Sequence, residues 1–116
     1  MRHRKKGKIL DRKRDQRRAL LKNLASSLVK AERIKTTLAK AKFLRPKIEK
    51  IISIGKKNNL QTRRRLISFF NDPKLAKKIL EEVSVRYKER RGGYTRIIKI
   101  GRRGGDGAKM AMIEFV

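Results

Sequence analysis

The 116-residue chain has no cysteine, only one histidine and two prolines, and only 5% aromatic residues. Without cysteine there is no disulfide framework, no thiolate nucleophile and no cysteine-ligated metal site. No apolar run approaches the roughly 20 residues of a membrane span, and the basic N-terminus lacks the apolar middle of a signal peptide. Acidic residues are scarce as well, with ten against 36 lysines and arginines.

Positive charge is what the chain has in excess, at a formal net value of +26. Such a density of like charge opposes a compact state through self-repulsion. We therefore expect a polyanion to neutralise it, and phosphate backbones are the commonest polyanion. The length predicts one domain, residues 11–116, preceded by a basic arm, residues 1–10. The arm has little to bury, so it is interpreted as a segment that orders on nucleic acid, with a solvated tail as the alternative.

Apolar residues at three- and four-residue spacing predict four helices. The first is basic and amphipathic; its apolar face is interpreted as core, with binding to an anionic membrane surface as the less favoured alternative. Asp72 followed by Pro73 is a strong helix start, because the acid can cap and the proline suits the first helical position. The predicted helices run from Arg12 to Ala31, from Leu38 to about Ile54, from Leu60 to Phe70, and onward from Pro73.

The second and fourth helices raise particular points. Thr37 can cap the second helix and Gly55 suits its end, but Pro46 conflicts with a helix interior, where proline costs about 3 kcal/mol. Either the helix kinks at this proline or two pieces meet there. In the fourth helix the lysines are matched by acidic residues, so we predict that it points away from the phosphates.

Two β-branched, apolar segments, Tyr94–Ile100 and Met110–Val116, flank a loop of glycines and cations and predict a C-terminal hairpin. A lone hairpin is marginally stable in water, so the helices are expected to cover it. Arg33–Thr37 alternates and could supply a third strand. The predicted fold class is α+β: about four helices packed on a small mixed three-stranded sheet that contains the hairpin, with a basic extended N-terminal arm.

Groups that could support catalysis are isolated from one another. His3 lacks rigid support and an acid partner nearby in sequence, so contact with a base or phosphate is the better interpretation. Glu81 and Glu82 lie about 100° apart on a helix and do not form a carboxylate pair. The glycines of residues 101–105 lack the helix and the Lys-Ser/Thr of a P-loop, and no cluster has metal-ligand spacing. We predict no enzymatic activity, no catalytic residue, no metal and no cofactor.

The few aromatic residues mostly belong to apolar stripes and cannot form a stacking platform for single strands. Binding should therefore rely on phosphates and shape. Tyr94, beside Gly92, Gly93 and Arg96, is the best aromatic candidate for an RNA contact, with a place in the core as an equal alternative.

Four groups of residues occur in an order and spacing that are specific together. They are Met1-Arg2-His3-Arg4-Lys5-Lys6-Gly7, then Ile34-Lys35-Thr36-Thr37-Leu38 with Lys40-Ala41-Lys42 and Leu44-Arg45, then Gly92-Gly93-Tyr94-Thr95-Arg96-Ile97, and finally Gly105-Asp106 with Ala108, Met110-Ala111 and Ile113-Glu114. End to end, the chain resembles family seventeen of the bacterial large-subunit ribosomal proteins. Pro46 departs from that pattern, because the family more often has proline where this chain has Ala39.

The resemblance implies an α+β structural protein of the cytoplasmic bacterial ribosome. Its implied partners are large-subunit ribosomal RNA and neighbouring large-subunit proteins, on the outer side of the subunit toward the peptide exit region; no membrane and no small-molecule substrate is expected. Within the four groups it implies RNA contacts by Arg2, His3, Arg4, Lys5, Lys35, Lys40, Lys42, Tyr94 and Arg96. The cationic regions at the two ends of the chain add Lys6, Lys8, Arg12, Lys13, Arg17, Arg18, Lys22, Arg90, Arg91, Lys99, Arg102 and Arg103.

Two other functions remain as alternatives. A non-ribosomal nucleic-acid-binding protein, of the nucleoid or RNA-chaperone kind, would have the same charge, although we find no helix-turn-helix spacing and no sustained heptad. A phosphate-handling enzyme would need a nucleophile and base, which the sequence does not offer. The favoured function is to bind and stabilise large-subunit ribosomal RNA through Lys and Arg contacts to phosphates, supporting subunit assembly and translation.

Overall fold

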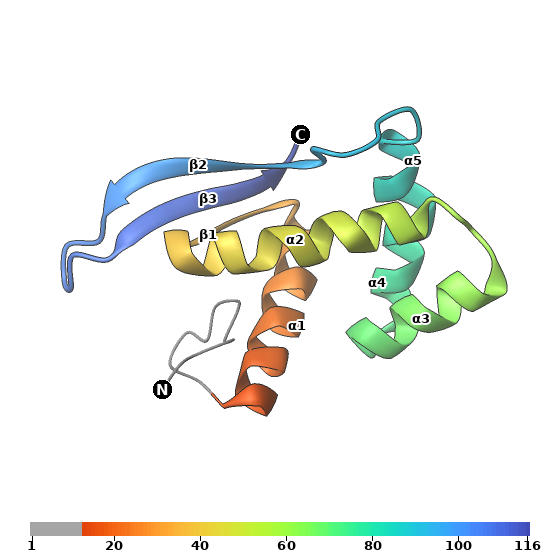
Figure 1. The fold of residues 1–116 in the computed structure, drawn as a ribbon, viewed down its shortest axis with the longest axis horizontal. Coiled ribbons are helices and arrows are strands. Elements are labelled where there is room, and N and C mark those ends of the chain that lie inside the picture. The colour runs from red at the N-terminus through yellow and green to blue at the C-terminus, as the bar shows by residue number, and fades with distance from the viewer. Residues whose placement is uncertain (1–12) are drawn as a thin grey trace, which may run out of the picture.

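The computed structural model of the chain describes residues 13–116. The predictions for the basic arm and for Arg12 concern residues outside this range. The elements in chain order are α1 (Arg14–Ala31), β1 (Arg33–Thr37), α2 (Leu38–Gly55), α3 (Leu60–Phe70), α4 (Pro73–Lys78), the π-helical segment η1 (Ile79–Val83), α5 (Ser84–Arg86), β2 (Thr95–Arg102) and β3 (Lys109–Phe115) (Figure 1). Among residues 13–116, every helix is too short or too polar to span a bilayer.

Polar side chains cap three of the helices. Thr37 accepts a hydrogen bond from the backbone N–H of the third residue of α2, as predicted, at 3.3 Å. Asn59 does the same for α3 at 2.8 Å. Asp72 accepts from the second residue of α4 at 2.9 Å, and Pro73 takes the first helical position. Each cap satisfies a backbone donor that the helix itself leaves free.

Pro46 lies inside α2, which runs as one helix from Leu38 to Gly55. The proline is exposed, whereas Leu44, Ile48 and the residues one and two turns later on the same face are buried. Burial of that face offsets the hydrogen bond that the proline removes. Of the two arrangements that the sequence allows at Pro46, a kinked helix or two pieces that meet, the structure excludes the second, because α2 is a single element.

The sheet is completed by the last strand, which lies in the middle, in the order β1-β3-β2. Both pairings are antiparallel, with Arg33 opposite Glu114 on one side and Arg96 opposite the same glutamate on the other. The α+β class, the helices and the C-terminal hairpin are confirmed. The sheet is antiparallel throughout, where a mixed sheet was predicted, because the long helical path between β1 and β2 leaves strand direction undetermined by local sequence.

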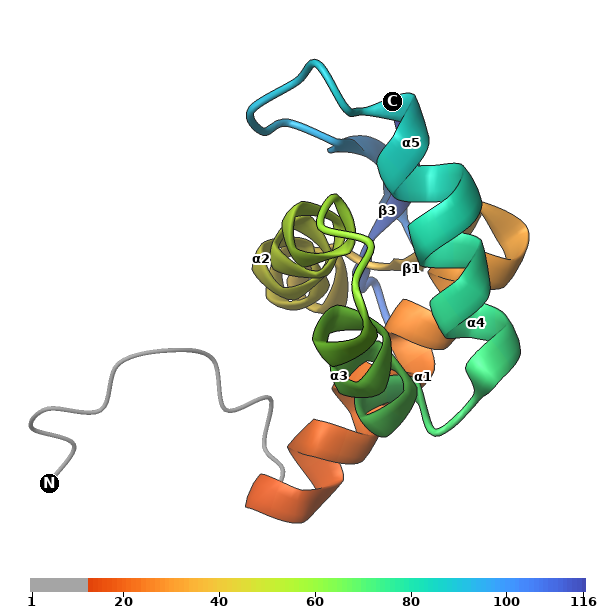
Figure 2. The ribbon, with the colours of Figure 1, turned by 90° about the vertical axis from the view of Figure 1, so that its right-hand side faces the viewer.

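Helix α2 lies between the sheet and the other helices. One face of the sheet packs on it through Ala111, Ile113 and Phe115, which alternate along β3 and are buried. Figure 2, which views α2 nearly end-on, shows α1 and α3 on the far side of α2 and the α4–α5 column beside it. The core is therefore built around α2, and the opposite face of the sheet is left uncovered by helices.

The predicted fourth helix is continuous but changes its winding. In η1 the N–H of Ser84 bonds to the carbonyl of Ile79, five residues back. This π-helical turn lets the buried side chain of Ser84 point at the end of α2, where its hydroxyl donates to the carbonyl of Ile52 at 3.0 Å. Gly55 sits against this contact. A Cβ atom there would lie 2.4 Å from the Ser84 Oγ atom, so glycine is needed for close approach.

Candidate nucleic-acid interface

The structure distributes the predicted RNA-binding residues over several surfaces. Seven of them, Arg2, His3, Arg4, Lys5, Lys6, Lys8 and Arg12, lie outside the described residues. The exposed ones are Lys13, Arg18, Lys35, Lys42, Arg90, Arg91, Arg96, Lys99, Arg102 and Arg103. Arg17, Lys22 and Lys40 are half-buried, and Tyr94 is buried.

The face of the sheet that points away from α2 carries Lys35 and Arg96. The register places Arg33, Glu114 and Arg96 in one row across the three strands. Glu114 accepts a hydrogen bond from the Arg96 Nε atom at 2.9 Å and lies 3.9 Å from the Arg33 Nε atom. One carboxylate thus serves two guanidinium groups, so with Lys35 this face keeps an excess of positive charge.

The hairpin loop is held by its own cations. Arg103 donates two hydrogen bonds to the Asp106 carboxylate, at 3.0 and 2.6 Å, and Asp106 also accepts from the backbone N–H of Ala108. The Arg103 bond is the main reason that the pKa of Asp106 lies well below its ordinary value. Arg102 donates to the carbonyl of Gly107 at 3.1 Å. Both arginines therefore order the loop as well as charging it.

The base of the hairpin loop meets the start of α2. Lys99, Arg102 and Lys109 line a shallow groove of about 260 Å³ together with the first residue of α2. Lys40 and Lys42 follow within the first turns of that helix. Segments far apart in sequence thus bring five cations to one end of the molecule.

Tyr94 belongs to the core, with 1% of its surface exposed. Its hydroxyl receives hydrogen bonds from Lys56 and Ser53 and donates to the carbonyl of Arg90. The Lys56 bond, followed by the Ser53 bond, lowers the pKa of Tyr94. The ring is therefore not available to stack on a base. Arg90 also donates to the carbonyl of Gly93 at 3.2 Å, so it shapes the turn that leads into β2.

Glu49, which is not among the residues that the sequence predicts as functional, anchors the start of β2. Its carboxylate accepts from the backbone N–H of Tyr94 at 3.0 Å, from that of Thr95 at 3.1 Å and from the Thr95 hydroxyl at 2.9 Å. These three bonds attach the sheet to α2. No local signal could have identified them, since the partners lie more than forty positions apart.

A groove between α1, α2 and α3 brings Arg18 and Lys22 together with Lys47. We call it the three-helix groove; it has a volume of about 430 Å³ and is lined by Arg18, Ala19, Leu21, Lys22, Lys47, Ser68 and Phe69. The ammonium group of Lys47 lies 4.8 Å from the centre of the Phe69 ring. Lys47 and Phe69 were not among the predicted contacts.

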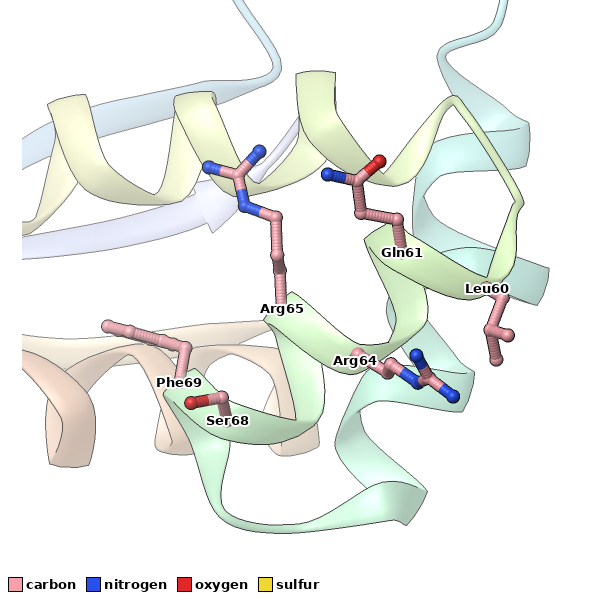
Figure 3. Close-up of a pocket in the computed structure, with 6 residues that line it drawn as sticks. All are labelled: Leu60, Gln61, Arg64, Arg65, Ser68 and Phe69. Atoms are coloured by element: carbon pink, nitrogen blue, oxygen red, sulfur yellow. The ribbon is translucent and has the colours of Figure 1, made fainter.

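The exposed side of α3 continues this basic surface. Figure 3 shows Arg64, Arg65 and Phe69 projecting from a shallow depression along the helix, which Leu60, Gln61 and Ser68 also line. The sequence shows three consecutive arginines here, but not which of them share a side with α1 and α2. In the structure, Arg65 lies on the side of α2, near Lys47.

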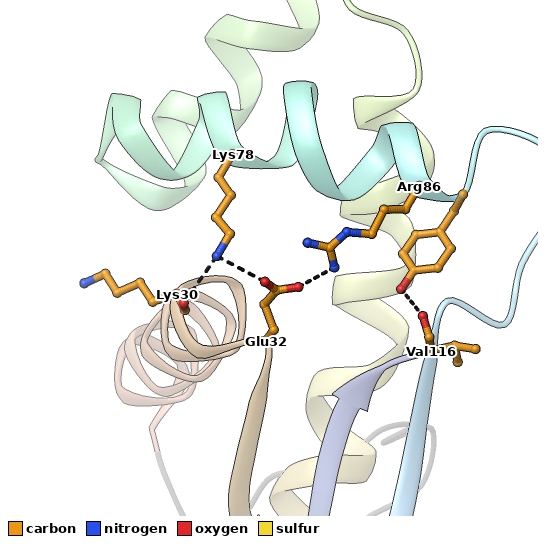
Figure 4. A network of polar contacts seen from close by, with 6 residues as sticks. Lys30, Glu32, Lys78, Arg86 and Val116 are labelled. Atoms are coloured by element: carbon orange, nitrogen blue, oxygen red, sulfur yellow. Dashed lines mark hydrogen bonds and ion pairs between the residues drawn. The ribbon is translucent and has the colours of Figure 1, made fainter.

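Two cations of the α4–α5 column, Lys78 and Arg86, are paired within the protein. Glu32, at the turn after α1, forms ion pairs with Arg86 and, at 3.8 Å, with Lys78 (Figure 4). Lys78 also donates to the carbonyl of Lys30 at 3.3 Å. The hydrogen bond from Arg86 is the main cause of the lowered pKa of Glu32. These contacts connect α4 and α5 to the end of α1.

Within residues 13–116 no three His, Cys, Asp or Glu side chains gather where they could hold a metal ion. The candidate interface is thus a set of cationic surfaces around a packed core. Its chemistry is the binding of anions by ammonium and guanidinium groups.

Comparison with known proteins gives a consistent result. Residues 20–116 match the family described as ribosomal protein L17. The large ribosomal subunit protein bL17 of Pelagibacter ubique is 54% identical over 116 residues, which cover all of this chain and 80% of that protein. The bL17 protein of Bradyrhizobium diazoefficiens is 52% identical, and the match covers all of this chain and 84% of that protein. The bL17 protein of Fusobacterium nucleatum is 50% identical, and the match covers both chains in full.

Proposed function

The chain belongs to the ribosomal protein L17 family and is a structural constituent of the bacterial large ribosomal subunit, and we propose that it binds and stabilises large-subunit ribosomal RNA through Lys and Arg contacts to phosphates. The predicted family and the predicted absence of enzymatic activity are confirmed, because the relatives are ribosomal structural proteins. We further propose that residues 11–116 act as one domain, that residues 1–10 order on RNA, and that neighbouring large-subunit proteins adjoin it.

The observation that carries the proposal is the number of exposed cations without an acidic partner. Glu32, Asp106 and Glu114 pair with cations inside the protein. By contrast, no ion pair among residues 13–116 involves Arg18, Lys35 or the hairpin-base cations Lys99, Arg102 and Lys109. A polymer of phosphates supplies the missing charge and gains affinity by releasing its counterions. The rigid core holds the cationic surfaces in place for a folded RNA.

A salt titration of binding to purified bacterial large-subunit RNA tests the proposal. If about eight to ten phosphates are engaged, the affinity of the full chain should fall roughly 10³- to 10⁵-fold between 50 and 200 mM salt. An affinity that hardly changes over this range would exclude phosphate neutralisation as the mechanism. Competition with duplex DNA gives the control: equal preference for the two polymers would favour the nucleoid alternative.

A further inference from the structure

We propose that the three-helix groove is a binding site for an RNA phosphodiester backbone, in which Arg18, Lys22 and Lys47 hold phosphate groups. This inference rests on the proposed function and assigns one of its contact sites. It involves residues of α2 and α3 that lie in the middle of the chain, away from the cationic ends on which the sequence focuses attention.

The first argument is uncompensated charge. Arg18 and Lys22 from α1 face the same groove as Lys47 from α2, and every described residue lining the groove is apolar, basic or a serine. Arg65 and Lys50 also lie near enough to repel Lys47. Cations on separate helices that converge without a carboxylate repel one another, and an anion placed between them relieves that repulsion.

The second argument is the way in which Lys47 is held. Its ammonium group lies over the Phe69 ring, which attracts a cation to its face. Burial, assisted by the charges of Lys50 and Arg65, lowers the pKa of Lys47. The side chain is therefore positioned and partly desolvated, yet it lacks a negative partner. A phosphate placed here would offset the cost of desolvation and reduce the repulsion.

The third argument concerns which anion fits. Arg14, Arg18 and Lys22 recur every four residues along α1, which is about 6 Å of helix per step. That repeat is close to the distance between successive phosphates in an RNA strand. Ala19, Leu21 and Phe69 give the groove an apolar floor on which a sugar can rest. A row of cations beside an apolar floor fits a sugar–phosphate strand better than a single small anion.

Substitutions that remove charge but keep an unbranched, flexible side chain provide the test. Lys47→Met and Arg18→Met, alone and together, are compared in the full chain with Lys74→Met and Lys77→Met, which remove the same charge from exposed positions of α4. We expect each groove substitution to weaken binding to large-subunit RNA about tenfold at 100 mM salt and to reduce the salt slope by about one. The α4 variants should change affinity by about twofold or less.

The outcomes separate this inference from the proposed function. Groove and α4 variants that bind RNA equally well, while the wild type still binds with a steep salt dependence, would overturn the inference alone. A wild type that binds RNA without salt dependence would overturn the proposed function. Circular dichroism during urea unfolding establishes that each compared variant is folded.

A lysine-acetylation footprint gives a second readout that does not depend on any variant. Acetylation of Lys47 should be several-fold slower in the presence of purified RNA than in the free chain, whereas acetylation of Lys74 should be unchanged. Protection of Lys47 in assembled large subunits but not by RNA alone would mean that a protein segment occupies the groove, and this would overturn the inference. Equal reactivity under all conditions would overturn it as well.

Discussion

Replacing Gly55 by alanine should destabilise the protein although the new side chain is a single methyl group. The added Cβ atom would lie 2.4 Å from the Ser84 Oγ atom and 2.8 Å from the Ile79 Cγ2 atom, both too close for real contacts. Neither neighbour is free to move, because Ile79 is fully buried and Ser84 is 2% exposed. The end of α2 and the π-helical turn must therefore separate.

The magnitude follows from three contributions. Overpacking a core typically costs 1 to 3 kcal/mol. Displacing Ser84 breaks its hydrogen bond to the Ile52 carbonyl and leaves a buried polar group unpaired, at a cost of about 1 to 3 kcal/mol. Alanine recovers about 1 kcal/mol through its better helix propensity. We expect the free energy of unfolding to fall by about 3 kcal/mol, a large part of the stability of a small domain.

Urea unfolding followed by circular dichroism measures this change. Urea is preferred because guanidinium chloride is a salt and would screen the repulsion within so cationic a chain. Gly92→Ala is the matched control, since its new methyl group meets no atom within 4 Å and should alter stability by less than about 0.5 kcal/mol. A Gly55→Ala variant as stable as the wild type would refute the close approach of α2 and the π-helical turn.

Two further predictions concern single carboxylates. Glu49→Ala removes the acceptor of three hydrogen bonds from Tyr94 and Thr95, so the free energy of unfolding should fall by about 3 kcal/mol in the same urea assay. Glu49→Gln should lower the free energy of unfolding by a smaller amount than Glu49→Ala. Equal losses for the two substitutions would contradict the three hydrogen bonds to Glu49. Arg86 lowers the pKa of Glu32 below its usual value of 4.5, so this carboxylate stabilises the fold above about pH 4.5, and the gain disappears as the pH falls through the lowered value. The difference in stability between wild type and Glu32→Gln should therefore be below about 1 kcal/mol at neutral pH, as for an exposed pair, and vanish in acid; a difference that does not vary with pH would count against the ion pair.

Local sequence signals account for most of the elements. The predicted strand Arg33–Thr37 has the observed bounds, and the caps Thr37 and Asp72 act as expected. These features depend on neighbours within four residues, which the sequence displays directly. The first helix begins at Arg14 instead of Arg12, and the hairpin strands differ by one or two residues at their ends.

Features that depend on distant partners could not be predicted. Helix α2 ends at Gly55, as predicted, but the sequence gives no sign that this glycine also lets Ser84 approach, which only the packing of α2 on η1 reveals. The sequence favours a core and a surface position for Tyr94 equally. Its hydrogen bonds with Glu49 and Lys56, which are distant in sequence, place it in the core. The three-helix groove likewise unites Lys47 and Phe69, whose sequence surroundings give no sign that they meet.

The central place of β3 governs when the molecule can form during translation. Arg33 and Arg96 both face Glu114 on a strand that leaves the synthesising ribosome after every other described element. Until residues 109–115 emerge, the edges of β1 and β2 that pair with β3 in the finished fold are open, and open edges are liable to pair with other chains. A nascent chain interrupted before this point therefore carries nearly all of its cations but lacks the complete three-stranded sheet that positions those of β1 and β2.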